Sequence, residues 1–175
     1  MVDYSLVLNQ AIGLLDGEPD ALANLANFAA FAYAEIADLN WAGFYFVHAD
    51  GTMVLGPFAG RPACTRLPPG RGVCGAAVAS RATVVVDDVN AFADHIVCDT
   101  ASQSEMVVPI LAGDAVVAVF DVDAPLRARF TDADRRGIER LVAAVAPFAI
   151  QLADTLGVSP TMKASQASKG IGIAR

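Results

Sequence analysis

The sequence predicts an α+β fold in which helices from the two ends of the chain flank one antiparallel sheet. Apolar residues recur at helical spacing near both ends, short β-branched and aromatic runs fill the middle, and Gly-containing turns join these runs into two hairpins. The 175 residues suffice for one domain with a substantial core. We expect this domain to span residues 1–156 and residues 157–175 to form a flexible tail.

Two helices are predicted before the sheet. The first covers residues 4–16, where apolar residues fit a helix, and Gly17-Glu18-Pro19-Asp20 interrupts it. The second, rich in alanine, covers residues 21–38, and Asp20 can cap its first turn.

The first hairpin pairs residues 40–47 with residues 52–57 across the turn Ala49-Asp50-Gly51. After it the sequence predicts a strand, a Pro- and Gly-rich turn, a short helix and a β-branched strand, at residues 63–67, 68–72, 73–79 and 83–86.

Residues 87–104 are polar and lack periodicity, which predicts a long loop, and a loop of this length in a compact domain is usually functional. The second hairpin follows, with strands at 106–111 and 115–122. A final helix to about residue 156 begins after Thr131, which forms a capping-box pattern with Asp134.

Charge and hydrophobic patterning exclude several classes of function. The net charge of −7 disfavours nucleic acid and anionic membranes as partners, because phosphate binding needs a basic face. No apolar run is long enough to cross a membrane, and the N-terminus has no basic segment before an apolar run. We therefore expect a cytoplasmic protein.

The chain has three cysteines, Cys64, Cys74 and Cys98, and an odd number disfavours a closed disulfide framework. Cys98 lies in the polar loop, where a thiol is accessible for chemistry, although a buried inert cysteine is the commoner case. Cys64 and Cys74 bracket the Pro- and Gly-rich turn, so either could pair with Cys98, or both could be core residues. Arg66 and Arg71 are near enough in sequence to lower a thiol pKa.

A zinc site built from the three cysteines and His95 has suitable ligand types. Their spacings match no common zinc module, so we expect no metal and no cofactor.

Two acids end an otherwise apolar strand. Asp121 and Asp123 have the same parity, shared with Val117 and Val119, so their side chains should point to one face. Glu105, at the start of the neighbouring strand, could join them. Either the strand ends at Asp121 and the acids are solvated, or they hold an ammonium group, or one stays protonated to donate a proton.

Trp41 and Tyr45 have the opposite parity to Phe44 and Phe46 in the first strand. Such aromatic residues are most often core. They could equally line a small pocket, where a ring face suits a cation or a sulfur atom.

Several segments together resemble the free methionine-R-sulfoxide reductase family, GAF-domain enzymes that reduce only the free amino acid. The resemblance covers about residues 5–155, and Val97, Thr100, Gln103 and Met106 are conservative departures from it. The matching segments are NWAGFY (40–45), GPF (56–58), AC (63–64), GRGVCG (70–75), HIVCD (95–99), SQSEMVVP (102–109) and FDVD (120–123).

The resemblance implies a single GAF domain with an antiparallel sheet of about six strands and the terminal helices on one face. It implies that Cys98 is the catalytic thiol, Cys64 the main resolving cysteine and Cys74 either an alternative resolver or a pocket thiol, with thioredoxin as reductant. The substrate pocket would be lined by Trp41, Tyr45, Glu105, Asp121 and Asp123.

Two alternatives stay open at this point. GAF domains also serve as small-molecule sensors, and a disulfide could act as a redox switch without sulfoxide turnover. The alanine-rich terminal helices could also pack in a homodimer.

Overall fold

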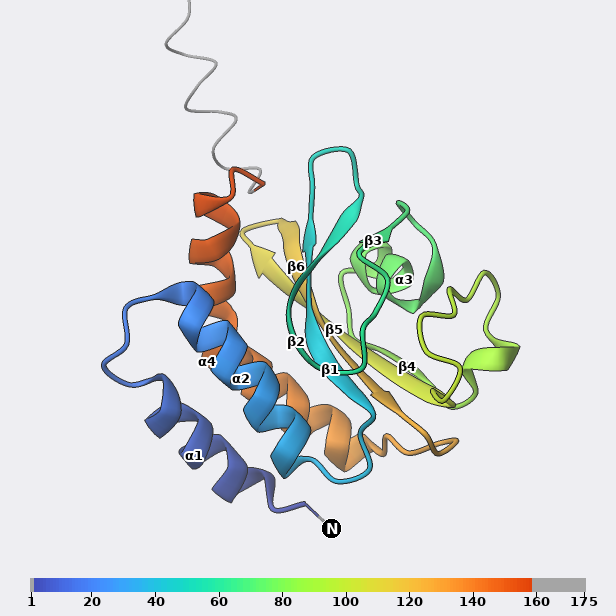
Figure 1. The fold of residues 1–175 in the computed structure, drawn as a ribbon, viewed down its shortest axis with the longest axis horizontal. Coiled ribbons are helices and arrows are strands. Elements are labelled where there is room, and N and C mark those ends of the chain that lie inside the picture. Colours follow the sequence, from blue (N-terminus) through green and yellow to red (C-terminus); the bar gives the residue numbers. More distant parts are fainter. Residues whose placement is uncertain (1, 159–175) are drawn as a thin grey trace, which may run out of the picture.

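A six-stranded antiparallel sheet forms the centre of the protein, in the order β3-β2-β1-β6-β5-β4. The computed structural model describes residues 2–158 (Figure 1). The strands are β1 (Trp41–Val47), β2 (Met53–Gly60), β3 (Arg66–Leu67), β4 (Val84–Val86), β5 (Ser104–Ala112) and β6 (Ala115–Ala124). The sheet class and strand number expected from the sequence are confirmed.

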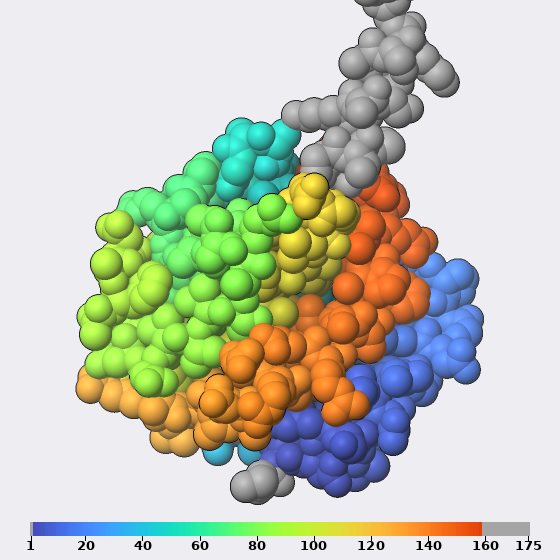
Figure 2. All heavy atoms as spheres, turned by 180° about the vertical axis from the view of Figure 1, so that it is seen from behind, coloured from blue at the N-terminus to red at the C-terminus, as the bar shows by residue number. Residues whose placement is uncertain are grey.

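Three helices cover one face of the sheet, and α3 lies on the other (Figure 1). Figure 2 shows from behind that α4, in orange, runs between the blue N-terminal segment and the green region of the opposite face. The helices are α1 (Tyr4–Leu15), α2 (Ala21–Glu35), α3 (Gly72–Ser80) and α4 (Asp132–Thr155), with a short 3₁₀ turn η1 (Val89–Ala91). Among the residues described, no helix is long and apolar enough to span a membrane.

The central strands β1 and β6 contribute to two separate cores. Phe44 and Phe120 pack with α2 in the larger core, on the helix side of the sheet. Trp41, Tyr45 and Val119 pack on the opposite side, with α3 and the start of the 87–103 segment. Because side chains alternate along a strand, the same two strands hold the fold together and present residues to the opposite face.

The sequence prediction was wrong at three points on this face. The strand expected over 115–122 continues to Ala124, which rules out the alternative that it ends at Asp121 with solvated acids. Val117 faces the helices instead of sharing a face with Asp121, because a β-bulge between the pairs Leu111–Val116 and Ile110–Ala118 leaves it as an extra residue. The expected loop at 87–104 contains η1, and its last residue already belongs to β5.

The termini of the longest helix follow the sequence prediction. The Thr131 side chain accepts a hydrogen bond from the Asp134 backbone N–H, and the Asp134 side chain accepts one from the Thr131 N–H, which completes the capping box. Asp20 likewise caps α2 by accepting from Ala23 N at 2.8 Å. The expected tail at 157–175 lies almost entirely outside the described residues, and its flexibility stays a prediction.

Candidate active site

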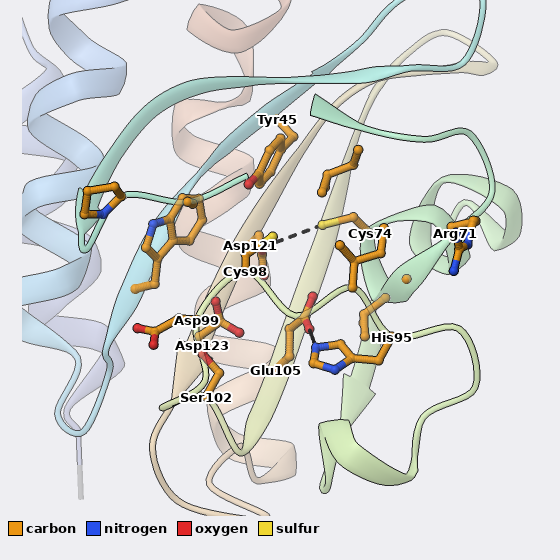
Figure 3. A pocket seen from close by; sticks show the side chains of 17 residues that line it. Tyr45, Arg71, Cys74, His95, Cys98, Asp99, Ser102, Glu105, Asp121 and Asp123 are labelled. Carbon is orange, nitrogen blue, oxygen red and sulfur yellow. Dashed lines mark hydrogen bonds and ion pairs between the residues drawn. The ribbon is translucent and has the colours of Figure 1, made fainter. Parts of the chain in front are cut away.

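A pocket opens on the sheet face opposite the terminal helices (Figure 3). It contains about 540 Å³ of space, a volume that includes the open solvent at its mouth. Most of the predicted site residues line it, namely Trp41, Tyr45, Cys74, Cys98, Glu105, Asp121 and Asp123. Segments from β1, α3, the 95–102 loop, β5 and β6 therefore meet at one place.

Cys64 is joined to Cys98 by a disulfide, with their Cα atoms 5.3 Å apart. Cys64 is not itself a lining residue, but the preceding Pro62 and Ala63 are. The segment after β2 and the loop before β5, 34 residues apart in sequence, thus meet at the pocket wall. Of the alternatives left open by the sequence, the structure pairs Cys98 with Cys64.

Cys74 is a buried free thiol in the first turn of α3. Its Sγ donates a hydrogen bond to Asp121 Oδ2 at 3.6 Å. Burial and the negative charge of Asp121 raise the pKa of Cys74 well above its ordinary value. The expectation that Arg71 lowers a thiol pKa here is wrong, because its exposed side chain approaches Asp94, 3.9 Å away.

The three carboxylates lie side by side across the sheet. Glu105 on β5 is paired with Asp123 on β6, and Asp123 is paired with Trp41 on β1. Asp121 lies two residues along β6, beside Gly43. Like charges at neighbouring sheet positions repel one another, so this arrangement costs stability unless protons or a cation neutralise it.

Burial and nearby negative charge raise the pKa values of all three groups. The pKa of Asp123 rises to about 7, through burial and the charge of Asp99. Burial, followed by the charges of the neighbouring acids, raises the pKa values of Glu105 and Asp121 well above their usual range. Asp121 Oδ1 is buried and accepts no hydrogen bond from the residues described. The pocket can therefore hold a shared proton or bind a compact cation.

The aromatic wall consists of three stacked rings. Trp41 stacks on Tyr45 with ring centroids 5.8 Å apart and on Phe58 with centroids 5.6 Å apart. Tyr45 is fixed by its hydroxyl, which donates to the Cys64 carbonyl at 2.9 Å. The prediction that Trp41 and Tyr45 line a pocket is thus correct, and Tyr45 also anchors the segment that carries Cys64.

Sequence reasoning missed a set of hydrogen bonds from Asn40 that holds the 98–102 loop against the sheet. Asn40 Nδ2 donates to Ser102 Oγ at 3.0 Å and to Asp99 Oδ2 at 3.3 Å, and Asn40 N donates to the Asp123 carbonyl at 3.0 Å. Asp99 Oδ1 accepts from Ala101 N at 2.9 Å, which is a local turn. The Asp-x-Ala turn after Cys98 was the available sequence signal.

Sequence reasoning also missed that the His95 ring lies next to the Glu105 carboxylate. His95 Nε2 lies 3.8 Å from Glu105 Oε2, and both side chains are largely buried (Figure 3). Burial lowers the pKa of His95. Its only apparent role in the sequence was as the fourth ligand of a zinc site.

Cys74, Glu105 and Asp121 offer metal-ligand atoms that lie within 4.8 Å of one another. The zinc set considered from the sequence does not match this group, because Cys64 and Cys98 are joined to each other. The absence of a metal stays a prediction.

Comparisons with known proteins agree with this architecture. The GAF domain family matches residues 23–149. The free methionine-R-sulfoxide reductase of Escherichia coli is 48% identical over 130 residues, which are 74% of this chain and 78% of that protein.

Two solved structures are similar over most of their length. Reduced fRMsr of Staphylococcus aureus superposes with a TM-score of 0.80 at 41% identity, covering 85% of this chain and 96% of that one. The free methionine-R-sulfoxide reductase of Neisseria meningitidis, solved with its substrate, has a TM-score of 0.80 at 40% identity. The match covers 89% of this chain and 92% of that one. The chain belongs to the GAF-domain family of free methionine-R-sulfoxide reductases.

Proposed function

We propose that this protein reduces free L-methionine-(R)-S-oxide to L-methionine through thiol chemistry at Cys98. The observation that carries the proposal is the Cys64–Cys98 disulfide at the wall of a pocket that is also lined by Glu105, Asp121 and Asp123. The family relationship supports the substrate and the choice of the R epimer.

Electrostatics support a free amino acid as the ligand. An ammonium group would neutralise part of the crowded negative charge and give Asp121 Oδ1 the partner that it lacks among the described residues. A residue inside a peptide has no α-ammonium group, so it cannot supply this neutralisation. We assign the ammonium to the carboxylate cluster and the methyl-sulfinyl end to the Trp41 ring.

The chemical step is a displacement at sulfur. The protonated sulfoxide is attacked at sulfur by the Cys98 thiolate, a sulfur–sulfur bond forms, and the sulfur–oxygen bond breaks to release hydroxide. Hydroxide then attacks Cys98 Sγ, the sulfur–sulfur bond breaks, methionine leaves as a thioether, and Cys98 becomes a sulfenic acid. One proton must reach the oxygen for this to balance, and a pocket carboxylate with a raised pKa can supply it.

The second step returns the enzyme to a reducible form. The Cys64 thiol attacks the Cys98 sulfenic acid, a sulfur–sulfur bond forms, and the hydroxyl departs as water with the Cys64 proton. A dithiol such as that of thioredoxin then reduces the disulfide by thiol–disulfide exchange. The geometry supports Cys64 over Cys74 for this step, because Cys74 is fully buried and hydrogen-bonded to Asp121.

The test is methionine release from each free methionine sulfoxide epimer, with dithiothreitol as reductant, for wild type and Cys98→Ser. We expect turnover of the R epimer that is lost in Cys98→Ser. Binding of the epimer without turnover by reduced, folded wild-type protein would instead indicate a sensor. Formation of the Cys64–Cys98 disulfide with peroxide alone, without methionine release, would indicate a redox switch.

A further inference from the structure

The imidazole of His95 faces the buried carboxylate cluster from the loop that carries Cys98. His95 Nε2 lies 3.8 Å from Glu105 Oε2, and the exposed fractions of the two side chains are 13% and 9%. The other histidine of the chain, His48, lies at the end of β1 and is not among the residues that line the pocket. The pocket therefore contains one imidazole, directly opposite one acid.

Glu105 differs from the other two acids in its partners. Asp121 accepts a hydrogen bond from Cys74, and Asp123 is beside Ser102, whose hydrogen bond opposes the rise in its pKa. The Glu105 carboxylate accepts no hydrogen bond from residues 2–158; His95 Nε2 lies 3.8 Å from it, and Cys74 and Asp121 lie within 4.8 Å of it without bonding to it. A carboxyl group with no fixed donor is free to lose and regain a proton without breaking a structural contact.

The proposed reaction requires this exchange in every cycle. Breaking the sulfur–oxygen bond transfers one proton from the pocket to the oxygen, so the cluster must regain one proton before the next substrate reacts. Glu105 and Asp121 are buried, which limits direct access of solvent to them. A partly exposed imidazole in contact with the cluster provides a route, since neutral imidazole accepts a proton at one nitrogen and releases one from the other.

We propose that His95 carries protons between solvent and Glu105, which makes Glu105 the carboxylate that protonates the sulfoxide oxygen. This inference rests on the proposed reductase function. His95 acts through Glu105, so it is a proton-transfer residue and not the acid that touches the oxygen.

The surroundings of His95 favour a neutral ring between transfers. The groups that face the same pocket are Tyr45 on β1, Cys74 on α3, Asp121 and Asp123 on β6, Asp99 of the loop, and Arg71 at the start of α3. Arg71 is directed toward Asp94 at the surface and does not pair with the cluster. Burial lowers the pKa of His95, whereas Glu105 holds its proton more tightly than an exposed acid. A proton accepted by the ring therefore passes readily to Glu105.

The test compares wild type, His95→Gln and His95→Ala with the matched control His48→Gln. Methionine release from the R epimer is measured with dithiothreitol between about pH 5.5 and 9, a range that spans the ordinary pKa of histidine. We expect His95→Gln to lower kcat by about ten- to a hundredfold near neutral pH, with a smaller deficit at low pH, and to leave KM within about twofold. Added imidazole should restore part of the rate of His95→Ala, and His48→Gln should behave as wild type.

Two results would overturn the inference while wild type remains active. One is an unchanged kcat in His95→Gln. The other is a loss that is the same at every pH, is not restored by imidazole, and is accompanied by a higher KM, which would indicate that His95 only packs against the loop. Lack of turnover by the reduced wild-type protein would instead contradict the proposed function itself.

Discussion

The thiol of Cys74 and the carboxylate of Asp121 form a buried hydrogen bond of 3.6 Å in the floor of the pocket. A thiol that donates to a carboxylate in an apolar setting is held in its protonated form, which is the unreactive form. The bond also occupies one oxygen of Asp121 and leaves the other free. The two residues therefore separate the chemistry of Cys74 from that of Cys98.

We predict that Cys64 and Cys74 differ sharply in their importance. Cys64→Ser should abolish thioredoxin-supported turnover, because Cys98 sulfenic acid then has no paired thiol. Cys74→Ser, which likewise removes one sulfur atom, should retain most of the thioredoxin-supported turnover. Mass spectrometry after one turnover, with dimedone to label sulfenic acid, measures the difference. Label on Cys98 in Cys74→Ser and a disulfide in Cys64→Ser would reverse the assignment.

Asp121→Asn should weaken substrate binding strongly. Removing one partner of a buried charge pair costs about 2–5 kcal/mol, which corresponds to a loss of at least about thirtyfold in kcat/KM. The matched control is Asp114→Asn in the exposed β5–β6 turn. Its partner within residues 2–158 is Arg81 on the surface, so this variant should leave kinetics unchanged. Unaltered kinetics in Asp121→Asn would contradict the assignment of the ammonium to this cluster.

Stability should fall as pH rises from about 4 to about 7. The pKa of Asp123 rises from 3.8 in the unfolded chain to about 7 in the folded protein, so the folded state binds the proton more tightly in this interval. The stabilisation is therefore complete below the unfolded pKa and is lost as pH passes through the folded one. Glu105 and Asp121 act in the same direction.

Melting temperature measured against pH without ligand checks this dependence. In Asp123→Asn the melting temperature should fall less steeply with rising pH, and in Asp114→Asn it should fall as steeply as in wild type. A melting temperature of wild type that increases across the interval would show that the acids are already neutralised by another group.

Gly43→Ala should impair both stability and substrate binding. A Cβ at this position would overlap with Phe58 Cβ and with Cη2 of Trp41, so the stacked rings of the pocket wall would have to move. The control is Gly13→Ala in α1, where a Cβ meets nothing within 4 Å and should stabilise the helix by about 0.5–1 kcal/mol. Thermal unfolding and KM of both variants test this, and an unchanged KM in Gly43→Ala would show that the Trp41 ring does not contact substrate.

Local patterns predicted most of the fold because they depend on near neighbours in sequence. Alternation placed Trp41 and Tyr45 on the pocket side of β1, and Asp121 and Asp123 on the pocket side of β6. The same rule failed at Val117, because a bulge shifts parity by one residue and leaves no mark in the apolar run AVVAVF.

The parts of the site that depend on loop paths were not predictable from spacing. Nothing in the sequence brings His95 opposite Glu105, or chooses Cys64 over Cys74 as the partner of Cys98, because both follow from how two irregular segments cross the sheet. The resemblance supplied the roles of the cysteines, which stay proposals. The homodimer, the cytoplasmic location and thioredoxin as reductant also stay predictions.

The sharing of β1 and β6 between two cores restricts how this pocket can change over evolutionary time. Deleting Val119 would turn both aspartates toward α2 and α4, and would place Phe120 in the pocket. Length variation is therefore tolerable in the turns that connect the strands but not within β6. New ligand preferences can arise on this scaffold by exchange of side chains and by remodelling of the 95–102 loop, while the strand lengths stay constant.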